Sequence, residues 1–369
     1  MSKANRIEKT CDMISFSKIL TIVVPSFNME ALLKKDLQSL LIEKNPQRIE
    51  VIVVNDGSTD QTLAIAKEFH SRFPQTFTFI DKENGNYGSC INAGLKIAQG
   101  KYIKILDADD YVDTSSFEAV VDFLETTDAD VVVNDYQKLY ISGKHEDFVY
   151  SFPAMQTLKI ADIYNEDSFS SLLMPALTYR TSILRDMGYH QTEGISYTDL
   201  EWCYAPMTQM STLCYFNQSV YVYVMGREGQ TMNPLIYRKR LSNLFQCLHS
   251  MMESLDNLSL EPWAERFSCE QLAKHACEIY RYHLIAHPNE PRELLRSFDI
   301  ALKEKNPKVY TIYKSAEYRK RIPYLFVEKW RSGGHENIPV AIRVREIIYN
   351  ILGSIHYHIM KYFNPNLRR

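Results

Sequence analysis

The chain has 369 residues, of which 45% are hydrophobic and 24% charged, and its formal net charge is −3. This composition is typical of a globular protein, and the small net charge favours neither a nucleic-acid partner nor a strongly acidic one. The length exceeds that of a typical single domain, so we expect two units, or one core with a large appendage.

Signals for secretion, membrane insertion and structural zinc are missing from the sequence. Residues 1–18 lack the apolar segment of a signal peptide, and no stretch reaches the roughly 18 uncharged apolar residues of a membrane span. The seven cysteines are odd in number, and none stands in a CxxC pair. We therefore expect a cytoplasmic protein with reduced cysteines and no zinc site.

The first 140 residues alternate between apolar runs and helix-like segments. Near-continuous β-branched runs separated by helices predict a parallel sheet buried on both faces, and hence an α/β fold. We expect strands at Ile19–Val24, Ile49–Val54, Phe77–Ile80, Tyr102–Leu106 and Asp130–Asn134, and helices at Glu30–Glu43, Thr59–Phe73, Tyr87–Gln99 and Phe117–Thr126.

The pattern is less regular after about residue 142. We expect a helix at Tyr197–Met207, paired strands within Leu213–Val224, and helices almost throughout after Tyr237. This order divides the chain into an N-terminal tail, an α/β domain and a helical C-terminal region, at residues 1–18, 19–236 and 237–369.

The end of the chain is basic and amphipathic. From Arg319 to Arg369, ten Lys or Arg residues stand against three Glu. Within Val340–Phe363, apolar residues at helical spacing form one face, and polar residues form the other. Two interpretations stay open: residues 340–369 lie against an anionic membrane surface, or their apolar face packs on the α/β domain or on a second copy in a homodimer.

Polar and aromatic residues follow three of the predicted strands, as Pro25–Asn28, Asn55–Ser58 and Asp107–Asp110. In an open parallel sheet, ligands bind beyond the carboxyl ends of the strands. The first turn contains no glycine, so a GxGxxG dinucleotide site and a Walker A loop are missing from it, and a nucleotidyltransferase, which would need a glycine-rich basic loop there, is disfavoured. An aromatic ring at Phe27 can stack on a base and Asp56 can accept its N–H groups, while the three clustered carboxylates favour a divalent cation.

The acidic run alone has simpler explanations. Short acidic runs at strand ends often serve as solvated turns or helix caps. A calcium loop would use Asp107, Asp109, Asp113 and Glu118, but it needs glycine where Val112 stands and an entering helix where a strand stands. The ligand-site interpretation therefore depends on the three strand ends together.

Four motifs in this order, VVPSFN, VIVVNDGSTD, ENGNYGSCINAGL and YIKILDADDYV, resemble the family 2 glycosyltransferases. The resemblance covers residues 20–134 closely and extends more loosely to about residue 233. It implies a GT-A fold, which is a Rossmann-like, mostly parallel sheet flanked by helices, here with a helical C-terminal extension. It also implies an inverting enzyme that moves a sugar from a nucleotide sugar, most often a UDP-sugar, to a saccharide or lipid-linked acceptor in cell-surface polysaccharide synthesis.

The resemblance assigns roles to residues of the first two turns. Pro25 and Phe27 would flank the base, and Asp56 would accept hydrogen bonds from the uracil. Asn28 and Glu30 belong to the first-turn motif and would order that turn or contact the nucleoside.

The DxD motif of the family falls on Asp107, Ala108 and Asp109. Asp107 would face the ribose or a metal-bound water, and Asp109 would hold Mn²⁺ or Mg²⁺ on the diphosphate. Asp110 would brace the loop. The metal neutralises the charge that develops on the leaving UDP.

Two further donor contacts are implied less directly. Family members commonly carry an Arg-Asn pair after the ENxG motif, and here the pair reads Ile91-Asn92, so a positive charge near the nucleotide is lost. Arg227 lies in a segment that resembles a loop closing over the donor, and it would pair with the diphosphate.

Inversion needs a base on the face of the sugar opposite UDP. In the family this base is an Asp of an acidic pair that opens a helix, and the matching stretch is GISYTDLEW. Asp199 is the predicted base, with Glu201 in reserve; the alternative is that Asp199 only stabilises the first turn of that helix.

The QxxRW motif of processive synthases is absent, which favours transfer of one sugar per encounter. The alternative function is a catalytically inactive partner subunit of another transferase. We expect a cytoplasmic location, with peripheral contact at the inner face of the membrane through residues 340–369 as a further possibility.

Overall fold

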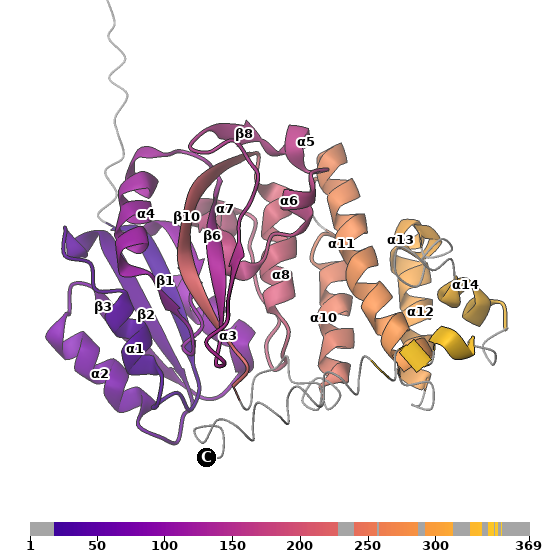
Figure 1. Cartoon of the computed structure of the whole chain (residues 1–369), viewed down its shortest axis with the longest axis horizontal. Helices are drawn as coiled ribbons and strands as arrows, with labels where there is room; N and C mark the ends of the chain where they lie inside the picture. The colour runs from indigo at the N-terminus through magenta and orange to yellow at the C-terminus, as the bar shows by residue number, and fades with distance from the viewer. Residues whose placement is uncertain are drawn as a thin grey trace, which may run out of the picture.

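The computed structural model describes residues 18–227, 240–256, 258–286, 292–312 and 325–333, together with 339–342, 344, 345 and 348. A part built around a sheet stands beside a group of helices from the last third of the chain (Figure 1). Among the described residues, no helix combines the length and the apolar character needed to cross a membrane.

The described strands form one curled sheet of ten strands, in the order β3-β2-β1-β4-β9-β6-β10-β5, with β7 added to β6 and β8 to β10. The pairs β1–β2, β1–β4, β2–β3 and β6–β10 are parallel, whereas β9 runs antiparallel between β4 and β6. The strands are β1 (Lys18–Ser26), β2 (Ile49–Asp56), β3 (Phe77–Lys82), β4 (Gly100–Ile105), β5 (Tyr111–Val112), β6 (Val131–Tyr140), β7 (His145–Phe148), β8 (Thr157–Lys159), β9 (Leu177–Arg180) and β10 (Thr212–Met225).

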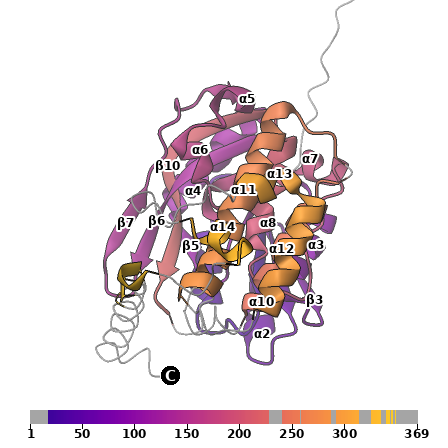
Figure 2. The ribbon, with the colours of Figure 1, turned by 90° about the vertical axis from the view of Figure 1, so that its right-hand side faces the viewer.

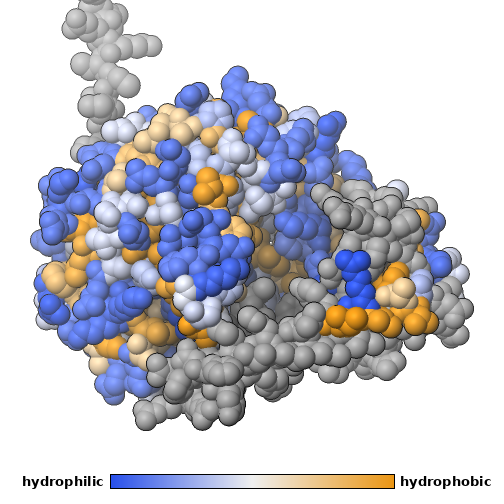
Figure 3. All heavy atoms as spheres, in the orientation of Figure 1, coloured by the Kyte–Doolittle hydropathy of each residue, from blue (hydrophilic) through white to orange (hydrophobic). Residues whose placement is uncertain are grey.

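Helices cover the sheet and bury its central strands on both faces. Every residue of β2 and β4 is buried, which requires cover on both faces. The helices of this part are α1 (Leu33–Ser39), α2 (Thr62–Arg72), α3 (Asn86–Ile97), α4 (Thr114–Thr126), α5 (Ile160–Ile163), α6 (Asp167–Ser170), α7 (Thr181–Asp186) and α8 (Asp199–Tyr204), with the 3-10 turns η1 (Pro46–Arg48), η2 (Met174–Ala176) and η3 (Pro206–Gln209). The visible face of this part is mostly hydrophilic (Figure 3). The predicted α/β fold is confirmed.

Two predicted elements differ from the structure. The paired strands expected within Leu213–Val224 are wrong, because this stretch lies in the single strand β10, whose register with β6 shifts between Phe216 and Tyr221. The exposed polar residues at this irregularity have the composition of a turn, but the ladder resumes beyond them. The helix expected at Glu30–Glu43 shortens to α1, because the residues before it form a turn.

The C-terminal helices pack against the sheet-containing part (Figure 2). Trp263 lies against Tyr164, with ring centroids 6.1 Å apart, and Phe267 lies against Phe169 at 5.4 Å. These helices are α10 (Leu241–Glu253), α11 (Pro262–Arg281), the π turn η4 (Tyr282–Ala286), α12 (Glu293–Lys305), α13 (Pro307–Ile312) and α14 (Phe326–Arg331).

The predicted division at residues 236 and 237 falls in 228–239, outside the described residues, and the tail at 1–18 is described only from Lys18. Most of the segment 340–369 also lies outside them. The domain boundaries and the membrane contact therefore stay predictions.

Candidate active site

The parallel strands β1, β2 and β4 are neighbours, so their carboxyl ends bring the three polar turns to one edge of the sheet, the lower edge in Figure 1. The first two turns are tied together. Asn28, at a left-handed φ of 53°, accepts a hydrogen bond at Oδ1 from the Thr59 N–H at 2.9 Å. Glu30 Oε2 accepts from the Gln61 N–H at 3.0 Å. Both side chains thus order the turn, and they leave the ring of Phe27 46% exposed.

Asp56 ends β2 as a buried carboxylate with a fixed orientation. Its Oδ1 accepts hydrogen bonds from Lys82 Nζ at 2.7 Å and from the Gly85 N–H at 2.9 Å. In the described part of the chain these bonds all involve Oδ1, which leaves Oδ2 to accept from a ligand. The sequence did not identify Lys82, although a lysine at the end of the neighbouring strand is the expected partner for a buried acid.

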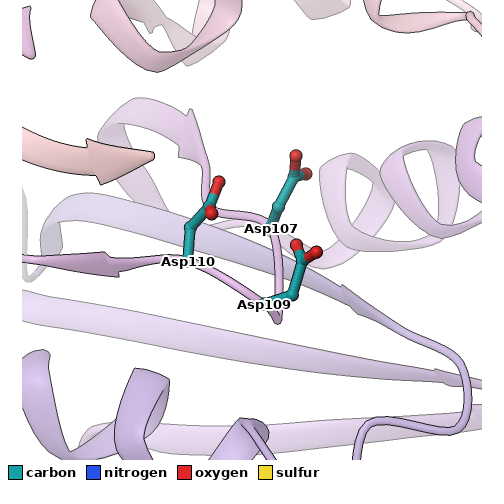
Figure 4. A group of neighbouring side chains, drawn as sticks. All are labelled: Asp107, Asp109 and Asp110. Atoms are coloured by element: carbon teal, nitrogen blue, oxygen red, sulfur yellow. The ribbon is translucent and has the colours of Figure 1, made fainter. Parts of the chain in front are cut away.

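Asp107, Asp109 and Asp110 form a compact acidic cluster at the end of β4, with Ala108 buried between them. One carboxylate oxygen of each lies within 4.8 Å of the others, and all three side chains rise on the same side of the loop (Figure 4). Asp110 connects the loop to β10, because its oxygens accept hydrogen bonds from the Tyr221 hydroxyl at 2.7 Å and the Val224 N–H at 2.8 Å.

The other two acids of the cluster face different partners. The Tyr87 hydroxyl donates to Asp107 Oδ1 at 2.8 Å, and the guanidinium of Arg227 forms an ion pair with Asp109. Burial, followed by the charge of Asp109, raises the pKa of Asp107 to about 7. Carboxylate oxygens are hard ligands, and a cluster of them that already attracts the Arg227 cation is a suitable ligand set for Mg²⁺ or Mn²⁺.

Asp199 begins α8 and faces this cluster. Its side chain is exposed to solvent, yet protein crowds it on most sides, and this partial burial raises its pKa. The negative charges of Asp107 and Asp199 both act on Tyr87, which places the three groups near one another. The structure therefore brings the predicted base to the predicted donor site, across 92 residues of sequence.

Glu201 has a different environment. It is 5% exposed, and its Oε2 accepts from the Thr192 N–H at 2.7 Å, so it supports the loop at residues 190–193. Asn92 supports the same loop, because its Nδ2 donates to Gln191 O at 2.8 Å and its Oδ1 accepts from the Gln191 N–H at 2.9 Å. Gly88 lets this loop pack closely against α3, since a Cβ at residue 88 would lie 2.0 Å from the Thr192 carbonyl oxygen. The donor contact predicted for Asn92 stays a prediction.

Asp36 is a buried acid near the cluster of Asp107, Asp109 and Asp110, and it was not identified from the sequence. It lies on the buried side of α1 with no exposure, and neither carboxylate oxygen has a hydrogen-bond partner among the described residues. Burial, and then repulsion by Asp110, raises its pKa well above 3.8. Asp36 shares the apolar face of this helix with Leu33, Leu37 and Leu40. A charged residue on an apolar face is the sequence signal that could have identified Asp36 as a buried acid.

We expect Asp36→Asn to stabilise the protein at pH 8, by about 1–3 kcal/mol, because it removes an unpaired buried carboxylate. Since the folded-state pKa is raised, the folded protein holds this proton more tightly than the unfolded chain, and wild-type stability falls as pH rises from about 4 toward that pKa. The gain should therefore shrink as the pH is lowered, in urea unfolding followed by circular dichroism.

A control with the opposite sign is Asp113→Asn. The Ser116 N–H lowers the pKa of Asp113, so this carboxylate contributes stability above its unfolded pKa and loses it on acidification. The control should lower stability slightly at pH 8. A loss of stability at pH 8 in the Asp36 variant would contradict the prediction.

Comparison with known proteins adds independent findings. Residues 21–173 match the family model described as glycosyl transferase family 2. TarS of Staphylococcus aureus, a poly(ribitol-phosphate) beta-N-acetylglucosaminyltransferase, is 26% identical over 224 residues, which are 60% of this chain and 37% of TarS. The minor teichoic acid biosynthesis protein GgaB of Bacillus subtilis is 35% identical over 112 residues, 30% of this chain and 12% of GgaB. The chain thus spans well under half of either relative.

The fold also matches a solved structure. The crystal structure of residues 1–349 of Staphylococcus aureus TarS in complex with UDP-GlcNAc superposes with a TM-score of 0.63 and 19% identity, over 87% of this chain and 94% of that one. At this identity the match shows a shared fold, including the helices that follow the sheet.

Proposed function

We propose that this chain, whose residues 21–173 match the glycosyl transferase family 2 model, is a member of that family and transfers one sugar per encounter from a UDP-sugar to a saccharide or lipid-linked acceptor in cell-surface polysaccharide synthesis. The observation that carries the proposal is the single edge of the sheet where an exposed aromatic ring, a buried oriented carboxylate and an acidic cluster meet. The relatives support the class of product, since both are named for teichoic acid or poly(ribitol phosphate).

The donor would lie along this edge. Phe27 would stack on the base next to Pro25, and Asp56 would accept a base N–H at Oδ2, held in place by Lys82. Asp109, with Asp107, would hold Mn²⁺ or Mg²⁺, which supplies charge neutralisation to the leaving diphosphate. Asp107 and Asp109 lie at the same edge of the sheet as the exposed ring of Phe27. This arrangement supports a nucleoside diphosphate as the leaving group.

Asp199 would accept the proton of the acceptor hydroxyl. The hydroxyl oxygen forms the new bond to the anomeric carbon, the bond from that carbon to the diphosphate oxygen breaks, and the configuration inverts because the two oxygens lie on opposite faces. A raised pKa suits this role, since a base nearer neutrality accepts a proton more readily. Glu201 is less suited, because it is buried and already accepts a hydrogen bond.

The inactive-partner alternative is less well supported. A chain that only supplies an interface has no physical need for Asp107, Asp109 and Asp199 near one another, where their mutual repulsion costs stability. A cytoplasmic location, contact of residues 340–369 with the inner face of the membrane, and a homodimer remain parts of the proposal that need their own tests.

A donor screen tests the function. UDP-Glc, UDP-Gal, UDP-GlcNAc, UDP-GalNAc, GDP-sugars and dTDP-sugars are titrated calorimetrically into the protein with Mn²⁺ or with EDTA. We expect at least one UDP-sugar to bind with Mn²⁺ and to be hydrolysed slowly, and saturation at about 100 times Kd should raise stability by about 2.7 kcal/mol. Failure of every nucleotide sugar to bind in any metal would rule out the enzyme.

A further inference from the structure

Arg227 places a positive charge inside the acidic cluster. Its guanidinium contacts the carboxylate and the main-chain oxygen of Asp109, and it lies 3.6 Å from Asp110 Oδ1. The side chain is only 15% exposed, and Nη2, the nitrogen that faces both carboxylates, also donates to the Val224 carbonyl oxygen at 3.3 Å. This cation is therefore held by the same loop that would hold a metal.

The guanidinium and a divalent cation need the same oxygens. Three carboxylates within 4.8 Å of one another repel, and a nearby positive charge is needed to keep them ionised together. Both oxygens of Asp110 accept hydrogen bonds from the protein, so Asp109 is the acid that the guanidinium would share with a metal held by Asp109 and Asp107. Two cations on one carboxylate also repel each other, so binding of one weakens binding of the other.

We propose that Arg227 is an exchangeable counter-ion of the cluster. It neutralises Asp109 while the donor is absent, and it releases this carboxylate to the metal when the metal and the nucleotide diphosphate bind together. The diphosphate then offers the guanidinium a new anionic partner, and a bidentate contact suits that geometry. This inference rests on the proposed function, because it assumes a metal-dependent nucleotide-sugar site.

The consequence is a coupling between metal and nucleotide. Metal alone must displace the guanidinium from Asp109 without offering it a new anion in exchange, so it binds weakly. Metal with the diphosphate binds well, because the arginine exchanges one anion for another. By linkage, removal of the arginine should strengthen binding of the metal alone and weaken binding of the nucleotide in its presence.

The test measures Mn²⁺ binding to the full chain by electron paramagnetic resonance, without nucleotide and then with UDP. Arg227→Met removes the charge at similar length, and Arg227→Lys retains it. We expect Arg227→Met to bind Mn²⁺ alone about tenfold more tightly than wild type and UDP with saturating Mn²⁺ about tenfold more weakly. The Mn²⁺ and UDP affinities of Arg227→Lys should lie between those of wild type and those of Arg227→Met.

A matched control is Arg48→Met. Arg48 pairs with Asp122 at 2.7 Å and with Glu125 at 2.8 Å on α4, so its loss removes an ion-paired arginine outside the cluster. Its Mn²⁺ affinity should equal that of wild type. Circular dichroism establishes folding, and if the methionine variant fails to fold, a lysine variant with wild-type Mn²⁺ and UDP affinities overturns the inference.

The outcomes separate the inference from the proposed function. If wild type binds Mn²⁺ and UDP together but Arg227→Met binds Mn²⁺ alone no more tightly, the exchange is overturned and the metal-dependent site stands. If wild type binds no Mn²⁺ even with UDP, both the exchange and the metal-dependent function are overturned.

Discussion

Replacement of Asp199 by asparagine is expected to reduce sugar transfer at least about 100-fold, the usual contribution of a general base, with little change in UDP-sugar affinity. Asparagine keeps the shape of the side chain but cannot accept the acceptor proton. The raised pKa of Asp199 and its exposure to solvent suit a group that exchanges a proton with a bound hydroxyl. Single-turnover transfer and calorimetric titration of the donor measure the two quantities separately.

Glu201→Gln is the matched control, since it changes an acid two residues away on the same helix. The glutamine oxygen can still accept from the Thr192 N–H, so transfer should persist within about tenfold of wild type, well above the loss typical of a missing general base. The opposite pattern, with transfer lost in Glu201→Gln and retained in Asp199→Asn, would move the base to Glu201.

The fold and the outline of the site could be predicted because both depend on local features. Continuous apolar runs such as Ile49–Val54 indicate strands buried on both faces, and the carboxyl ends of neighbouring parallel strands must share an edge. The positions of Phe27, Asp56 and Asp109 follow from this geometry alone. The single acceptor-side residue, Asp199, needed the family resemblance, because no local pattern connects it to the sheet.

The remaining contacts could not be predicted, because their partners are distant in sequence. Tyr221 and Asp110 are 111 residues apart, and their bond depends on the course of β10 past the loop. The family resemblance assigns Asn92 to the donor, but the sequence does not show that its amide also bonds Gln191, 99 residues away. Asp36 is a different case: its lack of partners is a property of the packed interior, which the sequence does not display.

Asp109→Asn is expected to weaken Mn²⁺-dependent UDP binding about 100-fold, or roughly 2.7 kcal/mol. The substitution removes the charge that would hold the metal, and it removes one ionic partner of Arg227. The quantity to measure is the ratio of UDP affinity with Mn²⁺ to UDP affinity with EDTA. In wild type this ratio should be large. In the variant it should fall to about 1, because the metal no longer contributes while the contacts of Phe27 and Asp56 with the uracil ring are unchanged.

Asp110→Ala distinguishes a metal ligand from a brace within the same cluster. Its loss leaves the Tyr221 hydroxyl and the Val224 N–H without their acceptors, so stability should fall by about 1–3 kcal/mol. The ratio of UDP affinities with Mn²⁺ and with EDTA should nevertheless remain large, since Asp109 and Asp107 are intact. A collapse of this ratio in Asp110→Ala equal to that in Asp109→Asn would mean that the three carboxylates hold the metal jointly. The assignment of one ligand, one donor contact and one brace would then be wrong.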